Sequence, residues 1–304
     1  MPDLRQLLAE AAEALQQAGV DEPRLTAEVL LAATIGQERS YLYAHPEEEL
    51  APAEAARART AIQARAAGTP LQYLTGVQEF YGRPFTVAPG VLIPRPETEL
   101  VVAAALEHVA PGEALRLLDV GTGSGCIAVT LARERPQARV VATDVSAAAL
   151  AIAAANAQFL GARVEFLQTD LTTGLSGPFD VIVSNPPYVA EAEVASLARE
   201  VREHEPRLAL VAGPSGDEIY ARLIPQARAR LRAGGWLVLE LGYASAAHVR
   251  GYVEGGGWTQ VETRRDALGW ERVLVAQRPP AGQRSRGEGA QAPVAPERAA
   301  APRP

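Results

Sequence analysis

The sequence contains no lysine, so arginine supplies all 29 of its basic residues. With 36 acidic residues the net charge is −7, and the four arginines and two glutamates of residues 279–304 leave −9 on the rest of the chain. Proteins that bind duplex nucleic acid usually present a basic surface. The charge balance therefore argues against a direct nucleic-acid partner.

Cysteine and long apolar runs are also scarce. The single cysteine, Cys126, excludes an internal disulfide and a multi-cysteine metal site, and we expect no bound metal. No run approaches the 18 or so apolar residues that a membrane span needs. Residues 1–15 carry charged side chains and no apolar signal-peptide core. We therefore expect a cytoplasmic protein with no membrane contact.

The first quarter of the chain has helical spacing. Leucines at positions 4, 7, 8 and 15 fall on one helical face, and Pro23 and Pro52 suit the first turn of two further helices. These features predict a helical bundle at 1–75, which serves either as a packing cap or as a docking domain for a partner. Residues 76–97 contain short bursts of β-forming residues broken by glycine and proline, which predicts a β-hairpin linker.

After Pro111, short apolar segments alternate with helical ones. Continuously apolar strands separated by helices are typical of a parallel sheet covered on both faces, and a short ALGW connection indicates that the last two strands form an antiparallel hairpin. The sequence thus predicts an α/β fold with a seven-stranded, mostly parallel sheet at 98–278, followed by a disordered tail at 279–304. The expected strands are 115–121, 138–145, 163–170, 179–187, 234–242, 258–266 and 271–278, and the expected helices are 97–109, 126–135, 147–160 and 219–232.

A glycine-rich loop follows the first of these strands and opens a helix. Its sequence is DVGTGSG, and its candidate ligand-binding residues are Asp119, Gly121, Thr122, Gly123, Ser124 and Gly125. Ligands of open α/β sheets bind beyond the carboxyl ends of the strands. Because residues 123–128 also fit G-x-G-x-x-A, a dinucleotide stays open as the ligand. Asp119 and the lack of flanking basic residues suit the cationic S-adenosylmethionine better than a pyrophosphate.

Two further aspartates end the next strands. Asp144 can accept hydrogen bonds from both hydroxyls of a cofactor ribose. It could instead cap the helix that follows, although Ser146 can fill that role. Asp170 ends the third strand, where we expect the adenine ring of the cofactor.

The stretch SNPPY, residues 184–188, ends the fourth strand. In a sheet ordered 3-2-1-4-5 it lies beside the glycine loop. The Asn185 side-chain carbonyl and the Pro186 main-chain carbonyl can accept the two hydrogens of one planar NH2 group. The fixed φ angles of Pro186 and Pro187 hold these acceptors in place, and Tyr188 can stack on a flat substrate group. The arrangement predicts a methyl transfer that depends on positioning and electrostatics, with catalytic roles for Asn185, Pro186 and Tyr188.

Three more stretches accompany these motifs: LIPRPETE at 92–99, EPRLAL at 205–210 with the segment 213–217, and GWLVLE at 235–240. Together with the glycine loop, Asp144, NPPY and the helical N-terminal region, they resemble the bacterial peptide chain release factor glutamine methyltransferases over residues 4–278. The resemblance implies a Rossmann-like class I methyltransferase fold. It also implies methyl transfer to the side-chain amide of the glutamine in the Gly-Gly-Gln motif of release factors.

The same resemblance assigns the site. It implies S-adenosyl-L-methionine as the cofactor, S-adenosyl-L-homocysteine as the product, and release factors as partners that dock on the helical region. The cofactor contacts would come from 121–125, Asp144 and Asn185, and the substrate contacts from 185–188. Some relatives have a tryptophan near the adenine where this chain has Leu171, which retains an apolar contact but no stacking.

Other functions remain open on these residues. A glutamine methyltransferase acting on a ribosomal protein would share every motif. A DNA adenine methyltransferase also presents a planar NH2 group beside NPPY, but it must flip its base and bind phosphates, which the acidic body disfavours. A non-catalytic binding module would have no need of an intact NPPY. The EHE run at 203–205 lacks a second histidine at ligand spacing, so we expect it to be solvated or structural.

Overall fold

The computed structural model describes residues 2–243 and 245–282. Residues 283–304, most of the segment expected to be a disordered tail, lie outside the described residues. In the described part of the chain, no helix combines the length and the apolar character that crossing a membrane requires.

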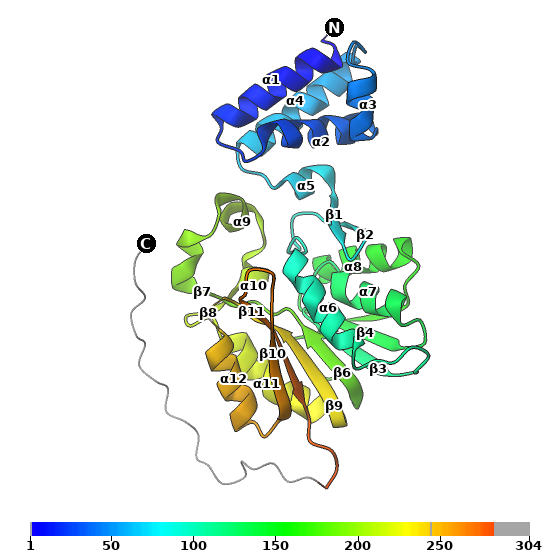
Figure 1. Ribbon diagram of the computed structural model, residues 1–304, viewed down its shortest axis with the longest axis vertical. Helices are drawn as coiled ribbons and strands as arrows, with labels where there is room; N and C mark the ends of the chain where they lie inside the picture. The colour runs from blue at the N-terminus through cyan, green and yellow to red at the C-terminus, as the bar shows by residue number, and fades with distance from the viewer. Residues whose placement is uncertain (1, 244, 283–304) are drawn as a thin grey trace.

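The N-terminal part of the chain is a helical bundle that stands apart from the sheet (Figure 1). The leucines expected on one face of the first helix are buried, and Pro23 and Pro52 each begin a helix. Two short helices were not predicted from the sequence. The bundle and the segment that leaves it consist of α1 (Leu4–Gln17), α2 (Pro23–Ile35), α3 (Arg39–Ala44), α4 (Pro52–Ala66) and α5 (Leu71–Thr75).

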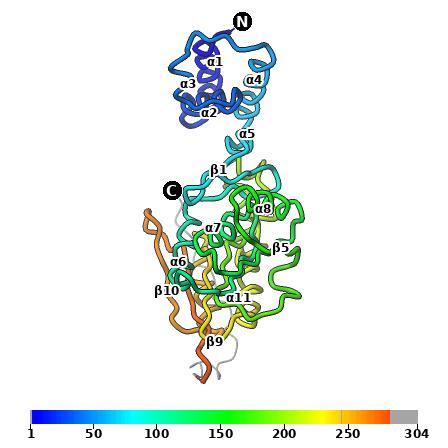
Figure 2. The backbone as a smooth tube through the Cα atoms, turned by 90° about the vertical axis from the view of Figure 1, so that its right-hand side faces the viewer, coloured from blue at the N-terminus to red at the C-terminus, as the bar shows by residue number. Residues whose placement is uncertain are grey.

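A β-hairpin, formed by β1 (Val77–Phe80) and β2 (Arg83–Thr86), lies between the bundle and the sheet (Figures 1 and 2). Asn156 ties the hairpin to the rest of the fold, because its side-chain amide exchanges two hydrogen bonds with the backbone of Thr86, at 2.8 and 3.0 Å. The chain then runs through η1 (Pro96–Thr98) into α6 (Glu99–Leu106).

The central sheet has seven strands in the order β10-β11-β9-β6-β3-β4-β5. The five strands from β9 to β5 are parallel, and β11 pairs antiparallel with both β9 and β10. This confirms the predicted sheet, including its antiparallel end. The strands are β3 (Arg116–Val120), β4 (Arg139–Asp144), β5 (Val164–Gln168), β6 (Phe179–Ser184), β9 (Leu231–Glu240), β10 (Thr259–Arg265) and β11 (Glu271–Gln277).

Both faces of the sheet are buried. Alternate residues of each strand face opposite sides, so Leu117 packs in one core and Leu118 in the other. Helices α6, α7 (Cys126–Glu134) and α8 (Ala147–Phe159) cover the first face, and α11 (Glu218–Arg230) and α12 (Ala246–Gly255) cover the second (Figure 1). The helix α12 was not predicted from the sequence.

An insertion between β6 and α11 projects toward the helical bundle. It contains β7 (Val189–Ala190), η2 (Glu191–Ser196), α9 (Arg199–His204), α10 (Arg207–Leu210) and β8 (Val211–Gly213). An ion pair joins it to α4 of the bundle, with Arg65 Nη1 2.6 Å from Glu200 Oε2. The insertion therefore bridges the bundle and the carboxyl edge of the sheet.

Candidate active site

The glycine loop and the SNPPY segment meet at the carboxyl edge of the sheet, as the sequence predicts. Strands β3 and β6 are neighbours, and Val120 pairs with Ser184 at their ends. The Ser184 hydroxyl donates to the Val120 carbonyl oxygen at 2.6 Å, which joins the two strand ends. The two segments therefore face one region.

The backbone of the glycine loop needs its glycines. Gly121 and Gly123 have φ angles of +73° and +56°, and a Cβ added at either would meet no atom within 4 Å. These glycines thus leave open space in front of the loop. Gly125, at φ +83°, packs instead against α8, since an added Cβ would lie 3.0 Å from that of Ala153.

Asp119 lies at the base of this loop and is fully buried. One carboxylate oxygen, Oδ2, accepts hydrogen bonds from the Thr122 hydroxyl at 2.6 Å and from the Ala128 N–H at 3.2 Å. The other, Oδ1, is buried with no partner among the described residues, and so is the Ser124 hydroxyl oxygen. Burial raises the pKa of Asp119 to about 7, although the two hydrogen bonds favour its ionised form. Buried polar atoms are normally satisfied, so this pair fits a cofactor that carries positive charge and hydrogen-bond donors.

Asp144 ends β4 and holds the same loop. Its Oδ2 accepts from the Gly123 N–H and its Oδ1 from the Ser146 N–H, each at 2.9 Å. Ser146, not Asp144, caps the following helix, since its Oγ accepts from the Ala149 N–H at 3.2 Å. Each carboxylate oxygen of Asp144 retains a lone pair, so the geometry leaves acceptors for ribose hydroxyls.

Asp170 and Leu171 follow β5. The Asp170 carboxylate forms an ion pair with Arg222 of α11 and its side chain is 53% exposed. Leu171 adopts a left-handed backbone with φ 52°, and its carbonyl oxygen accepts from the Thr143 hydroxyl at 3.1 Å. Its side chain packs partly buried against the second core. The ion pair of Asp170 was not predicted from the sequence.

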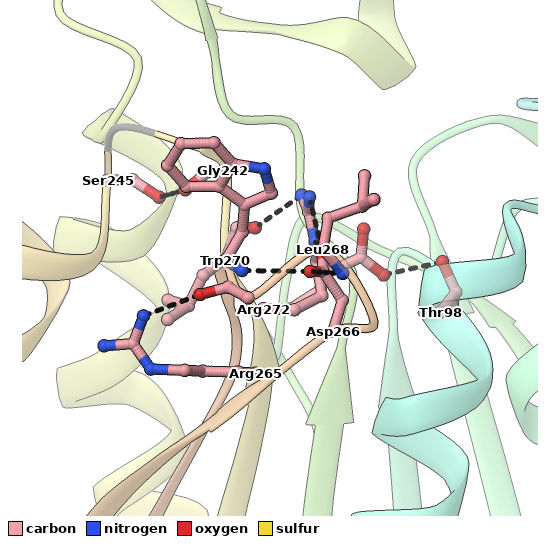
Figure 3. A network of polar contacts seen from close by, with 11 residues as sticks. Thr98, Gly242, Ser245, Arg265, Asp266, Leu268, Trp270 and Arg272 are labelled. Atoms are coloured by element: carbon pink, nitrogen blue, oxygen red, sulfur yellow. Dashed lines mark hydrogen bonds and ion pairs between the residues drawn. The ribbon is translucent and has the colours of Figure 1, made fainter.

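The side-chain amide of Asn185 is held from one side. Its Nδ2 donates to the Thr98 hydroxyl oxygen at 3.2 Å, and that hydroxyl donates to Glu240 Oε2 at 2.6 Å. No described residue donates to Asn185 Oδ1, so this acceptor is available to a substrate. Thr98 is the last residue of η1, directly before α6 (Figure 3), and Glu240 ends β9. Burial raises the pKa of Glu240 to about 7, against the effect of the Thr98 hydroxyl and Arg272.

Tyr188 is the last residue of the SNPPY segment. Its ring lies against the backbone of Gly242, where an added Cβ would stand 2.7 Å from the ring carbon Cδ2. Burial raises the pKa of Tyr188 to about 12. At neutral pH the phenol is therefore protonated, which agrees with a packing role and not with that of a general base.

A pocket of about 210 Å³ opens beside Asn185 and Tyr188. Residues of the linker and of the insertion line this pocket, and Arg95 is one of them. Arg95 is held by the buried Glu205, which also accepts from the Ile93 N–H at 3.1 Å. The other lining residues are Leu92, Val189, Leu197, Val201, Ala209 and Leu210.

A larger hollow of about 990 Å³ lies at the opposite edge of the sheet, along the amino ends of β3, β4 and β5. Arg116, Arg139 and Arg163 are among the residues that line it, and none of the predicted site residues does. The smaller pocket is therefore the candidate for substrate binding.

Three residues of the site were not assigned roles from the sequence: Thr98, Glu240 and Glu205. Each lies in one of the stretches 92–99, 205–210 and 235–240, which accompany the glycine loop and NPPY in the sequence. A single acidic residue within an apolar strand, as in LVLEL, is the signal that could have identified Glu240, because a buried carboxylate needs a partner.

Comparisons with known proteins agree with this geometry. Residues 6–76 match the family model of the PrmC N-terminal domain, and residues 98–208 match that of the methyltransferase small domain. A methyltransferase from Pyrococcus furiosus has the same fold, with a TM-score of 0.50 at 19% identity, over 73% of this chain and 98% of that one. The fold and the site thus define a class I methyltransferase that uses S-adenosylmethionine.

Curated relatives narrow the class. The chain is 47% identical to the release factor glutamine methyltransferase of Koribacter versatilis, over 91% of this chain and 99% of the relative. It is 48% identical to that of Moorella thermoacetica, over 90% and 98%, and 44% identical to that of Deinococcus radiodurans, over 90% and 98%. The chain belongs to the release factor glutamine methyltransferase family.

Proposed function

We propose that this chain transfers the methyl group of S-adenosylmethionine to the side-chain amide nitrogen of the glutamine in the Gly-Gly-Gln motif of peptide chain release factors. The observation that carries the proposal is the orientation of Asn185. Its NH2 group is occupied by Thr98, and its Oδ1 is left to accept a hydrogen from a substrate NH2 group. The Pro186 carbonyl supplies the second acceptor, and the small pocket beside Asn185 admits a side chain.

In the proposed step, the amide nitrogen forms a bond to the methyl carbon as the bond from that carbon to sulfur breaks. The electron pair stays on sulfur, so the sulfonium becomes the neutral thioether of S-adenosylhomocysteine, and one amide proton is lost to water. The two carbonyl acceptors hold the nitrogen in place. Their partial negative charge stabilises the positive charge that develops on it. Tyr188, protonated at neutral pH, would pack against the substrate amide.

Residues around the loop would hold the cofactor. Asp119 and Ser124 offer buried, unpartnered oxygen atoms, Asp144 offers acceptors for the ribose, and Gly121 and Gly123 leave room for the ligand. Leu171 would give an apolar contact to the adenine, and Asp170 would lie near it at the rim. When bound, the cofactor supplies an electrophilic methyl group on a positively charged sulfur.

The helical bundle, residues 1–75, is proposed to dock the release factor, with 76–97 as linker and 98–278 as the catalytic domain. The ion pair between Arg65 and Glu200 supports this division of roles, because it fixes the bundle beside the insertion that walls the pocket. We expect the reaction in the cytoplasm and without direct contact to nucleic acid. The names of the relatives favour a release factor over a ribosomal protein or DNA as the substrate.

A methyl-transfer assay with radiolabelled S-adenosylmethionine tests the proposal. Purified release factor is offered with its natural Gly-Gly-Gln motif and with the glutamine replaced by alanine. We expect label in the first protein only. Label in both would place the modification at another residue, and label in neither, with cofactor still bound, would refute the release factor as substrate.

A further inference from the structure

Three side chains from three separate segments form a chain of hydrogen bonds behind the proposed methyl acceptor. Asn185 follows β6, Thr98 precedes α6, and Glu240 ends β9, the neighbour of β6. Thr98 and Glu240 are 2% and 1% exposed, so both lie in the protein interior. The two hydrogen bonds, of 3.2 and 2.6 Å, run from Asn185 to Thr98 and from Thr98 to Glu240.

The direction of these bonds follows from the number of protons. A hydroxyl has one proton to donate, and Thr98 gives it to the Glu240 carboxylate. The Thr98 oxygen can then only accept, so it selects the NH2 end of the Asn185 amide. The carbonyl end, Oδ1, must face the opposite side, where the substrate nitrogen would bind.

A flipped Asn185 amide would be inactive. Its NH2 group would point at the NH2 group of the substrate, and two donors cannot bind each other. We propose that Thr98 and Glu240 are positioning residues that keep the acceptor oxygen of Asn185 aimed at the substrate. This inference rests on the proposed function. It adds the two residues that decide which end of the Asn185 amide faces the substrate.

The same series of hydrogen bonds makes Asn185 Oδ1 a stronger acceptor. Hydrogen bonds in series polarise one another in a low-dielectric interior, so a carboxylate at one end makes Asn185 Oδ1 more negative at the other. That oxygen is the atom that faces the nitrogen as positive charge develops. Tyr220 keeps the end of β9 in place, since its hydroxyl donates to the Glu240 backbone oxygen at 2.7 Å.

The ionisation state of Glu240 controls the direction of the two hydrogen bonds. A protonated carboxyl could donate to Thr98 and release the Thr98 proton toward Asn185. Because burial brings the pKa of Glu240 to about 7, we expect kcat at saturating cofactor to fall as the pH drops below about 7. The other titratable or charged groups whose interactions involve Glu240 are Arg95, Glu97, Cys126, Tyr188, Tyr220 and Arg272.

A double-mutant cycle tests the proposal. Thr98→Val keeps the shape of the side chain and removes the hydroxyl, and it should lower kcat at least about tenfold. Thr98→Ser should restore kcat to near the wild-type value. In the Asn185→Ala background, Thr98→Val should have no further effect, because it acts only through Asn185. Cofactor affinity, measured by calorimetry, should stay within about twofold when Thr98 is changed in either background.

Glu240→Gln is the second variant to test. A glutamine amide can donate to Thr98 and so reverse the direction of the two hydrogen bonds. We expect it to lower kcat and to remove the pH dependence near 7. Equal losses from Thr98→Val in both backgrounds, or a Thr98→Ser variant as impaired as Thr98→Val, would overturn the positioning role. Failure of the wild type to methylate release factor would instead refute the proposed function.

Discussion

Glu205 binds Arg95 across 110 residues of sequence. The same carboxylate accepts from the buried N–H of Ile93, so one side chain fastens the linker to the insertion. Its side chain is 1% exposed, against 32% for Arg95. The wall of the pocket beside Asn185 therefore depends on a single buried acid.

Replacing this acid should destabilise the protein. Glu205→Ala leaves the Ile93 N–H without its acceptor, and we expect the free energy of unfolding to fall by about 2 kcal/mol. Glu203→Ala is the matched control two residues away. Its ion pairs with Arg199 and Arg202 are exposed to solvent, so they should contribute much less. Urea denaturation of both variants measures the difference, and equal losses would contradict the structural role of Glu205.

Asp144→Ala should weaken cofactor binding at least about tenfold, because charge-assisted hydrogen bonds contribute roughly 1.5–3 kcal/mol each. The variant also frees the Gly123 N–H that Asp144 holds. Asp170→Ala is the comparison, and its loss should be smaller because that carboxylate is half exposed and paired with Arg222. Isothermal calorimetry gives both affinities. An unchanged affinity for Asp144→Ala would remove that residue from the site.

The seven strands and the two loops of the candidate site could be predicted because their signals are local. Apolar runs mark the buried parallel strands, and glycines and prolines mark the turns that follow them. The adjacency of the glycine loop and SNPPY then followed from the strand order. Gly123 and Asn185 were expected close together on this ground, and the strand ends before them are joined by the hydrogen bond from Ser184 to Val120.

The insertion at 189–213 and the supporting residues could not be predicted, because their structure depends on distant partners. Thr98 and Glu240 are 142 residues apart, and Arg65 and Glu200 are 135 apart. The periodicity of apolar residues in the sequence carries no information about contacts between such distant positions. Helix α12 was not predicted for another reason. Glycines at 251 and at 255–257 interrupt the helical spacing of its apolar residues.

Asn185→Ala should lower kcat by about 10²-fold or more, as the loss of one transition-state hydrogen-bonding group does. Cofactor affinity should be less affected than kcat, since the Asn185 Nδ2 is bound to Thr98 and its Oδ1 would face the substrate. Single-turnover methyl transfer to release factor, with cofactor affinity measured by calorimetry, separates the two effects. Normal turnover would refute the proposed clamp on the substrate NH2 group.

Cofactor binding should release a proton from Asp119. In the free protein the pKa of Asp119 is about 7, so below pH 7 the carboxyl is mostly protonated. A bound cation near its unpartnered oxygen favours the ionised form and lowers that pKa. Binding then becomes stronger as the pH rises, by about fivefold from pH 6 to pH 7 if the ionised form alone binds.

Calorimetry at pH 6, in two buffers with different ionisation enthalpies, measures this proton. At that pH the ammonium group of the cofactor stays protonated, so it contributes nothing to the count. We expect nearly one proton released per cofactor bound by the wild type and none by Asp119→Asn. Release of the same number by both proteins would assign the proton to another group and separate Asp119 from the charge of the cofactor.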